Sequence, residues 1–579
     1  MSSKRRDTLF IVLMLLPAIL IVLWQIYYPV LRGIVMAFQN YNLYNLSKVK
    51  FIGFDNFKEL LTPSPFNSFI RTIKNTVIWV FGSLIPQFLI GFAIAMLLRR
   101  AFRGRGVYQG VISFPWAVSG FIIGIMWRWM FNGTSGVIND VLQKLGLIEQ
   151  PIGWLSSGST SLLSVIIANI WYGIPYFVIM ITAALQGVPQ ELYEAADMDG
   201  AGSLAKFRVI TLPHIKSVLI LTCLLRVIWI FNGPEAIIAM TNGGPDHDVV
   251  YVHIDQQSGL RQGQCRRCDL YGDPDALYDL LSEDHQLKQG GLGMIISSRE
   301  RRNPAFWGGQ VVKFAILIFH LLITIFPFFW MISTALKSTQ AEIYAYPVIY
   351  FPKVPTFQNF IDIATKGHFL TYFANSFFYS AVATVVGTFI AILAAYVLSR
   401  MRFRGRTAIL FFFILTQMLP GFVGLAPKYQ MYSQMGLINT RIGIILIYIG
   451  NVLPYSIITL RAFFDGVPES IEEAALIDGC SRLDSVFRIA VPLMIPGIAS
   501  VLIFDFVNTW NELFSAILFL DTDDLKTITV GLNALIQKSD IAWGQMMAGT
   551  IIAILPTILL FALLRKYMMA GLTSGAVKG

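Results

Sequence analysis

The sequence predicts an all-α, polytopic membrane protein made of two related halves in tandem. Of its 579 residues, 55% are hydrophobic and only 13% are charged, whereas about a quarter of the residues of a soluble protein are charged. Long apolar runs recur along the whole chain, and one polar stretch between such runs occurs twice. These observations exclude a soluble globular protein and indicate an internal duplication.

The apolar runs predict about 11 transmembrane helices. Each run approaches or exceeds the roughly 20 residues that a helix needs to cross a bilayer. Five runs lie in the first part of the chain and six in the second. They are Leu9–Val30, Thr76–Leu98, Val107–Trp129, Leu162–Leu185, Val218–Met240, Phe314–Leu336, Ser380–Leu398, Ile409–Leu425, Ile442–Leu460, Ile495–Leu518 and Ala548–Leu564. The two parts therefore differ by one predicted span.

The basic residues predict which ends of these helices face the cytoplasm. The formal net charge is +10, but Lys and Arg collect in short loops at residues 4–6, 99–105, 299–302 and 400–406. Such clusters beside spans mark the cytoplasmic side, so we interpret them as orientation signals and predict no nucleic-acid partner. Residues 99–105 (RRAFRGR) are also similar to residues 400–406 (RMRFRGR).

The repeated polar stretch is the most specific feature of the chain. Residues 187–213 read GVPQELYEAADMDGAGSLAKFRVITLP, and residues 466–492 read GVPESIEEAALIDGCSRLDSVFRIAVP. Both fit E-A-A-x3-G-x9-I-x-[LV]-P without a gap, at a constant offset of 279 residues. Pro213 and Pro492 fit the start of the next helix, where a missing N–H costs nothing. A single copy could be an amphipathic loop helix with one solvated side, but two copies in register indicate duplicated halves.

Each copy of this stretch, called the EAA loop from here on, predicts a short helix followed by a turn. Gln190–Met198 and Glu469–Ile477 consist mainly of helix-forming residues. Gly200 and Gly479 follow them, and glycine adopts a positive φ at little cost. We therefore expect a water-exposed helix–turn beside the membrane in each half.

The two halves are unequal. The first half, residues 1–254, has five predicted spans, and the second half, residues 294–579, has six. Residues 255–293, where a sixth helix of the first half is expected, are polar, mixed in charge and without periodicity. If the N-terminus is cytoplasmic, five spans would place residues 299–302 outside and the two EAA loops on opposite faces.

We interpret residues 255–293 as an aberrant polar linker translated out of frame. Permitted codons, read one base forward, can spell an apolar helix with a basic end and then a stop. Met294 would then be a natural start of the second half. On this hypothesis the chain joins two adjacent genes, and the sequence of the underlying DNA would test it.

A zinc site is the rival interpretation of this linker. Cys265-x-x-Cys268 has the spacing of a zinc-binding pair, and His253 and His285 could complete it. The histidines are unevenly placed, however, and no second cysteine pair follows. The pattern therefore favours a zinc site only weakly.

The EAA loop resembles the coupling loop of binding-protein-dependent ABC importer permeases. TNGGP at 241–245 resembles the first permease subunit of the maltose-type carbohydrate family, and the chain from Met294 resembles its partner subunit. The resemblance covers nearly everything except about 255–293. It implies two tandem type-I ABC importer permease halves, fused in one multi-pass protein of a bacterial cell membrane (inner or plasma).

The resemblance also implies partners and coupling residues. In that family the EAA loop docks into a cleft of the ATPase subunit at the cytoplasmic surface. An ABC ATPase dimer on the cytoplasmic face and an extracytoplasmic sugar-binding protein are therefore the implied partners, beside the lipid bilayer. The implied ATPase-coupling residues are Glu194, Ala195, Ala196, Gly200, Glu473, Ala474, Ala475 and Gly479.

The sequence contains no G-x-x-x-x-G-K-[ST] pattern, so the chain cannot cradle ATP phosphates in that manner. We predict no catalytic residues, metal or cofactor, and we predict the permease component of an ATP-driven, binding-protein-dependent importer for a sugar, oligosaccharide or polyol. A stand-alone secondary transporter with internal repeats is the alternative, and it leaves the paired EAA loops unexplained. A membrane-embedded enzyme would need a metal or nucleophile cluster, and none is evident.

Ionisable residues within spans are costly and indicate function. Arg226 lies near the middle of the fifth span, and the 279-residue offset places Asp505 at the equivalent point of the second half. The same offset relates Asn232 to Asn511. We predict that Arg226 and Asp505 lie close enough to interact, as a structural pair or as part of a gate. Separate hydration of each side chain in a cavity is the alternative.

The resemblance implies a sugar site on the fourth and fifth helices of the first half. The fourth helix supplies Asn169, Gly173 and Tyr176, and the fifth supplies Trp229 and Asn232. Aromatic faces stack on sugar rings and amides bind hydroxyl groups, so these residue types suit a carbohydrate. Packing against neighbouring helices is the alternative role for the single aromatic residues.

Overall fold

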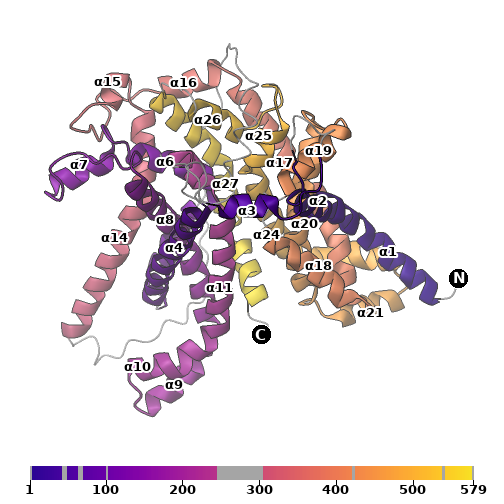
Figure 1. Cartoon of the computed structure of the whole chain (residues 1–579). Helices are drawn as coiled ribbons and strands as arrows, with labels where there is room; N and C mark the ends of the chain where they lie inside the picture. The colour runs from indigo at the N-terminus through magenta and orange to yellow at the C-terminus, as the bar shows by residue number, and fades with distance from the viewer. Residues whose placement is uncertain are drawn as a thin grey trace.

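In the computed structural model the regular elements of the described residues are helices. The structure describes residues 3–41, 49–62, 69–99, 102–243, 304–419, 424–536 and 541–576. Within these ranges one isolated bridge joins Gln39 to Phe51, and there is no strand. Figure 1 shows the long helices in two groups, with α14 beside the helices of the first half and α1 beside those of the second. The predicted all-α, polytopic fold is confirmed.

The described residues of the first half form five units that can cross a membrane. The second unit is a single helix and so is the fourth, whereas the third is bent by 95° at a break. In order, the units are α1 (Ser3–Val22) with η1 (Leu23–Tyr27) and α2 (Tyr28–Met36); α4 (Phe69–Leu98); α5 (Arg105–Ala117) with α6 (Gly120–Met130); α8 (Gly158–Gln186); and α10 (Ser203–Lys206) with η3 (Phe207–Thr211) and α11 (Leu212–Asn232).

The described residues of the second half also form five such units, together with one shorter apolar helix. One of these units is again a bent pair, with an angle of 80°. In order, the elements are α14 (Pro304–Ala335); α17 (Phe369–Arg400); the shorter helix α18 (Arg406–Met418); α20 (Arg441–Phe464); α22 (Arg482–Asp484) with η6 (Ser485–Ala490), α23 (Val491–Leu493) and α24 (Ile495–Trp510); and α27 (Trp543–Ala576).

The described residues account for nearly all of the predicted spans. Eight helices of the described residues are long and apolar enough to cross a membrane, or up to ten if each bent pair counts as one span, against eleven predicted. The discrepancy arises at Ile409–Leu425, where helix α18 ends at Met418 and residues 420–423 lie outside the described part. Helix α11 ends at Asn232, before the predicted end of the span Val218–Met240. Pro234 follows two residues later, and its missing N–H cannot continue an α-helix.

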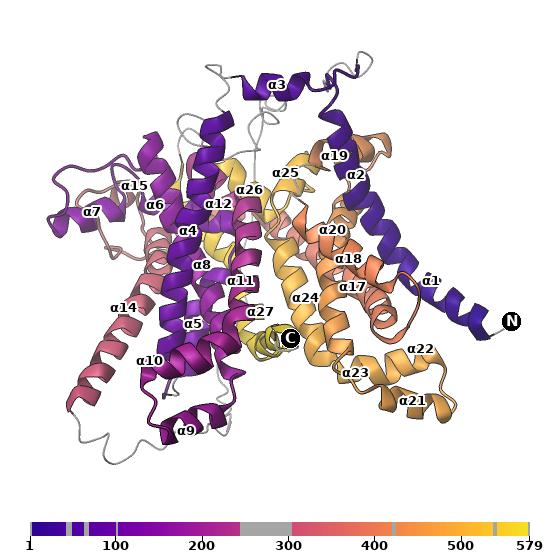
Figure 2. The ribbon, with the colours of Figure 1, turned by 60° about the horizontal axis from the view of Figure 1, so that its bottom comes forward.

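Short helices lie at the ends of the spans. Figure 2 shows α9 and α21 along the edge opposite to α3, and α14 begins near the edge that carries α9. α12 lies nearer the α3 edge and packs on α6. These helices are α3 (Asp55–Leu61), α7 (Val137–Lys144), α9 (Gln190–Met198), α12 (Glu235–Thr241), α15 (Gln340–Ile343), α16 (Gln358–Thr365), α19 (Leu425–Gln434), α21 (Glu469–Ile477), α25 (Phe514–Phe519) and α26 (Ile528–Ile536). Arg99 and Arg400, which begin two of the basic loops, contact α9 and α21, so the distribution of basic residues indicates that this edge faces the cytoplasm.

The two halves exchange their first spans. The first span of the chain packs on α17 and α20 of the second half, and α14 packs on α5, α6 and α4 of the first half. The Tyr27 hydroxyl of the first span also donates to the Phe412 carbonyl of α18 at 2.7 Å, and the Trp129 indole of α6 donates to Thr334 of α14 at 3.0 Å. The halves therefore share one continuous core.

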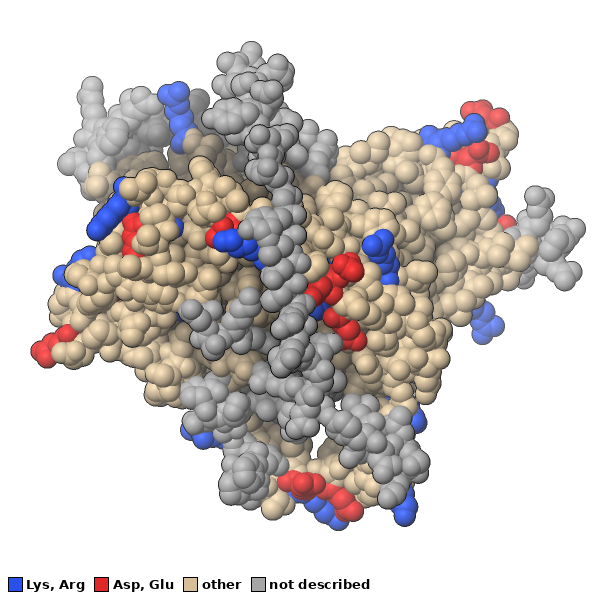
Figure 3. Space-filling view, turned by 90° about the horizontal axis from the view of Figure 1, so that it is seen from above, with Lys and Arg blue, Asp and Glu red and all other residues tan. Residues whose placement is uncertain are grey.

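The outer face adds a polar contact between the halves. Burial raises the pKa of the Asp140 carboxyl, but hydrogen bonds from Lys144, Tyr350 and the Val348 amide outweigh it, so the pKa lies below its ordinary value. Lys144 Nζ lies 2.7 Å from Asp140 Oδ2. Figure 3 looks down on this face, where Lys and Arg side chains lie in small groups beside Asp and Glu. The lowered pKa keeps the carboxylate charged and the two halves joined there.

Candidate functional site

The two EAA loops form the helices that the sequence predicts. α9 covers Gln190–Met198 and α21 covers Glu469–Ile477. Each starts directly after a proline and ends before a glycine with positive φ, +70° at Gly200 and +90° at Gly479. An added Cβ at either glycine would meet no atom within 4 Å, so backbone conformation alone explains the glycine.

The prolines that close the EAA loops lie at the start of helices, as predicted, but a π-helical turn precedes each one. η3 leads into α11, where Pro213 is near the first position, and η6 leads into α23, where Pro492 is near the first position. A proline lacks the N–H that an α-helix would use, and π-turns accommodate such interruptions. In the first half the span therefore runs on from η3 into α11, whereas in the second half it bends by 80° between α23 and α24.

The exposed faces of α9 and α21 carry most of the predicted coupling residues. Glu194, Ala195, Glu473 and Ala474 are exposed, as are both glycines, whereas Ala196 is half-buried and Ala475 is buried. Exposed carboxylates on a cytoplasmic edge are available to a partner. The coupling role itself stays a prediction.

An arginine from the first basic loop supports α9. The guanidinium carbon of Arg99 lies 3.9 Å from the centroid of the Tyr193 ring. The Tyr193 hydroxyl lies 2.8 Å from the Thr211 hydroxyl, which belongs to η3. Tyr193 therefore joins the basic loop, α9 and the following span.

The equivalent arginine of the second half supports α21 through an ion pair. Arg400 Nη2 lies 2.7 Å from Glu472 Oε1, and the two side chains are only 8% and 6% exposed. Arg400 also donates to the Val467 carbonyl at 2.8 Å. The sequence analysis missed both supports, although the two arginines begin the similar basic loops, and that position was the available signal.

A central cavity of about 500 Å³ lies between the halves. Six predicted pathway residues line it, and the first half and the second half each contribute to the lining. The six are Asn169, Arg226, Trp229, Asn232, Asp505 and Asn511. Gly173 and Tyr176 are not among the lining residues, but each adjoins one of them: Gly173 lies next to Arg226, and Tyr176 lies next to Trp229. The structure thus brings most of the predicted pathway residues together around one space.

Arg226 is held by neutral groups. Its side chain is 4% exposed. Nε donates to Gln87 Oε1 at 2.8 Å, and Nη2 donates to Asn169 Oδ1 at 3.4 Å. The guanidinium carbon lies 5.5 Å from the centroid of the Tyr172 ring. Gly173 makes room for this arrangement, because an added Cβ would lie 2.6 Å from Arg226 Nη2 and would also strike Gln87.

Asp505 is held within the second half and does not pair with Arg226. Its Oδ2 atom accepts from Ser456 at 2.6 Å and from Thr388 at 3.3 Å. Oδ1 has no hydrogen-bond partner among the described residues. No ion pair within this part of the chain joins Asp505 to Arg226, although both line the same cavity. Their predicted interaction, as a structural pair or as part of a gate, stays a prediction.

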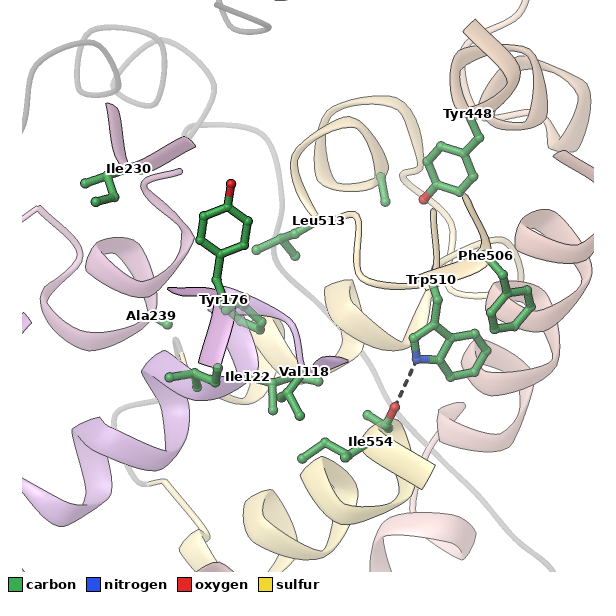
Figure 4. Close-up of a cluster of buried hydrophobic side chains, with 14 of the residues drawn as sticks. Val118, Ile122, Tyr176, Ile230, Ala239, Tyr448, Phe506, Trp510, Leu513 and Ile554 are labelled. Carbon is green, nitrogen blue, oxygen red and sulfur yellow. Dashed lines mark hydrogen bonds between the residues drawn. The ribbon is translucent and has the colours of Figure 1, made fainter. Parts of the chain in front are cut away.

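Tyr176 packs rather than opening onto the cavity. Its ring centroid lies 5.1 Å from that of Trp229, and the side chain is 4% exposed. Figure 4 shows it among Val118, Ile122 and other apolar side chains; on the opposite side of this cluster, Trp510 donates to the Ala553 carbonyl at 2.9 Å. Packing, the alternative role considered for the aromatic residues, fits this contact.

The cavity also contains polar residues that the sequence analysis did not select. Glu512 accepts from the backbone amides of Ser515 at 2.7 Å and Ala516 at 3.2 Å, so it caps α25. Glu235 lies in the first turn of α12. Both follow the paired asparagines closely in sequence, and that was the available signal. The other unselected polar lining residues are Ser119, Tyr172, Gln417, Tyr448, Asn451, Tyr455, Asn508 and Thr509.

No group of His, Cys, Asp or Glu able to hold a metal occurs among the residues that the structure describes. The suggested zinc ligands Cys265, Cys268, His253 and His285 lie outside those residues, as does the linker 255–293. The hypothesis of an out-of-frame linker is therefore also untested by the structure.

Comparison with known proteins identifies related chains. The family model described as binding-protein-dependent transport system inner membrane component matches twice, at residues 87–265 and 387–573. The inner membrane ABC transporter permease protein YcjP of Escherichia coli K12 is 38% identical over 265 residues, 45% of this chain and 94% of that protein. The diacetylchitobiose uptake system permease protein DasC of Streptomyces coelicolor is 35% identical over 255 residues, 44% and 92% of the two chains. The trehalose/maltose transport system permease protein MalG of Thermococcus litoralis is 31% identical over 262 residues, 45% and 93%.

Proposed function

This chain belongs to the family of binding-protein-dependent inner-membrane transport components and carries its domain twice, and we propose that it is the transmembrane permease of an ATP-driven importer for carbohydrates. The observation that carries the proposal is the pair of exposed coupling helices on one edge of the molecule (Figure 2). One partner with two equivalent subunits can engage both. An ABC ATPase dimer fits that description, and ATP hydrolysis would then take place in the partner.

The braced coupling helices support this role. Arg99, which follows α4, contacts α9, and Arg400, the last residue of α17, contacts α21. Glu194 and Glu473 are exposed to water. A rigid helix that is anchored to the transmembrane bundle can pass a movement of the ATPase to the cavity. A stand-alone secondary transporter would have no use for two such helices.

The cavity supports a carbohydrate substrate. Trp229 offers an aromatic face, and Asn232 and Asn511 offer amides from opposite halves. A sugar presents apolar ring faces and hydroxyl groups, which these residue types match. Two of the relatives are named for diacetylchitobiose and for trehalose or maltose uptake, and an extracytoplasmic sugar-binding protein would deliver the substrate.

The proposed domain organisation is a first permease half at 1–254 and a second at 294–579, joined by the out-of-frame linker 255–293. α12 and the start of α14, which flank this region, lie toward opposite faces (Figure 2). DNA sequencing across codons 250–300 tests the out-of-frame linker, and the absence of an apolar alternative frame would rule it out.

Transport by the reconstituted complex tests the function. The full chain, an ABC ATPase from the same organism and a sugar-binding protein are placed in proteoliposomes, and uptake of labelled maltose and of labelled digalacturonate is measured. We expect uptake that requires ATP, and we expect E194A/E473A to abolish it while Glu149→Ala, an exposed change on the outer face, leaves it intact. ATP-independent uptake driven by an ion gradient would instead establish a secondary transporter.

A further inference from the structure

Arg226 carries a charge that the described part of the protein does not neutralise. Only 4% of the residue is exposed. It donates two hydrogen bonds, to the neutral amide oxygens of Gln87 and Asn169. No carboxylate within the described residues forms an ion pair with it. A buried charge in a membrane is costly unless it is paired. The Arg226 guanidinium therefore has no counter-ion among the described residues.

The geometry leaves Arg226 able to bind one. Nε and Nη2 are used, whereas Nη1 has no hydrogen-bond partner among the described residues, and the residue lines the central cavity. Asn169 Nδ2 beside it is buried and also has no partner in that part of the chain. Arg226 Nη1 and Asn169 Nδ2 are thus two unused donors on residues that line the first-half side of the cavity. Guanidinium groups bind carboxylate and phosphate with high geometric specificity.

Three carboxylates line the cavity, and two of them, Glu512 and Asp505, accept hydrogen bonds within the second half. Glu512 caps α25, Glu235 lies in the first turn of α12, and Asp505 accepts from Ser456 and Thr388. Asp505 Oδ1 remains an unused acceptor on the second-half wall. The first half therefore contributes the Arg226 and Asn169 donors together with the Glu235 carboxylate, and the second half contributes the unused Asp505 acceptor.

We propose that the transported carbohydrate is an acidic sugar, whose anionic group binds Arg226 and Asn169 and whose hydroxyl groups face Asp505. The anionic group is a carboxylate, a sulfonate or a phosphate ester. This inference rests on the proposed carbohydrate transport and names its substrate class. Gly173 is a positioning residue, because a side chain there would displace the Arg226 guanidinium.

Equilibrium binding to the purified full chain tests the proposal with probes that differ only in charge. Digalacturonate and its dimethyl ester have the same rings and hydroxyl groups. We expect the wild type to bind the acid at least about tenfold more tightly than the ester, since losing one partner of a buried charge pair weakens binding by at least that factor. Arg226→Gln is expected to remove this preference by weakening binding of the acid at least about tenfold. An unchanged preference in R226Q overturns the proposal.

Further arms separate the sources of the anion and guard against misfolding. Glucuronate and glucose 6-phosphate are expected to compete with digalacturonate, and competition by inorganic phosphate at the same concentration would overturn the assignment to a sugar. If R226Q fails to accumulate, Gly173→Ala takes its place, with Gly367→Ala, where an added Cβ meets nothing within 4 Å, as the matched control. G173A is expected to lose the acid preference, and equal preference in the two variants overturns the proposal.

The gate hypothesis gives a different result. If Arg226 and Asp505 pair in another conformation, D505N abolishes uptake of acidic and neutral sugars alike, and R226Q/D505N restores it, which would overturn the proposal. In the reconstituted complex, uptake of maltose without uptake of digalacturonate refutes the acidic substrate and leaves carbohydrate transport standing. Uptake of neither sugar, nor of any carbohydrate delivered by the binding protein, refutes the proposed function itself.

Discussion

The two coupling helices have the same backbone and different supports. α9 and α21 have equal length, begin after a proline and end before a glycine with positive φ. α9 is held by Arg99 against the Tyr193 ring, and α21 is held by the buried ion pair of Arg400 and Glu472. The arginine is retained in both halves, while its partner changes from an aromatic face to a carboxylate.

The difference shows which features the repeat requires. The glycine and the proline fix the path of the backbone, and few other residues can replace them. The arginine needs only an electron-rich partner at the buried face of the helix, and either a ring or a carboxylate meets that need. The carboxylate forms the stronger contact, but its loss leaves a buried charge.

The largest effect is expected from Glu472→Ala. Removing this carboxylate leaves the Arg400 guanidinium buried without a counter-charge, which destabilises a protein by about 3–5 kcal/mol. Thermal unfolding of the purified full chain would show a large fall in the midpoint, together with loss of ATPase binding by α21.

The neighbouring residue provides the matched control. Glu473 is exposed, so Glu473→Ala is expected to leave the unfolding midpoint nearly unchanged and to weaken the interaction with the ATPase. Equal loss of thermal stability in E472A and E473A would contradict the assignment of one carboxylate to the support and the other to the partner.

Tyr193→Leu is expected to have a smaller effect. It removes the cation–π contact with Arg99, which contributes about 0.5–2 kcal/mol, and the hydrogen bond to Thr211, which contributes about 1 kcal/mol. Arg99 is half-buried and can still reach water, so no isolated charge results. Tyr193→Phe keeps the ring and is the control: its unfolding midpoint should lie between those of the wild type and Y193L.

Alanine at Gly200 or Gly479 is expected to have equal effects in the two halves. Both residues have a positive φ and open space around Cα, so alanine introduces backbone strain of roughly 1–2 kcal/mol and no clash. The unfolding midpoints of G200A and G479A should fall by similar amounts. A large inequality would show that the two turns are not equivalent.

The sequence predicted the backbone path of α9 and α21 but not the arginine contacts that support these helices. Proline, glycine and helix-forming residues act locally, so their pattern predicted α9 and α21 with the bounds observed. Tyr193 and Glu472 contact arginines about 70 to 95 residues earlier in the chain, and nothing in the local pattern reports such a contact. The cavity shows the same limit, because the offset placed Arg226 opposite Asp505 but could not predict Gln87 and Ser456 as their partners.

The smallest effect on stability is expected when the helix cap of the second half, Ser481, is introduced at the equivalent position of the first half. Ser481 caps α22 by accepting from the Asp484 amide at 3.1 Å, and the equivalent residue before α10 is Gly202. The backbone angles agree closely, with φ −69° and ψ 161° at Ser481 and φ −69° and ψ 163° at Gly202, so serine fits at 202 without strain. Gly202→Ser should therefore raise the free energy of unfolding by a few tenths of a kcal/mol, and Gly202→Ala, which adds no acceptor, should lie about 0.5–2 kcal/mol below G202S. If G202S and G202A have the same free energy of unfolding, a serine cap before α10 contributes nothing to stability. The sequence difference between Gly202 and Ser481 would then have no effect on stability.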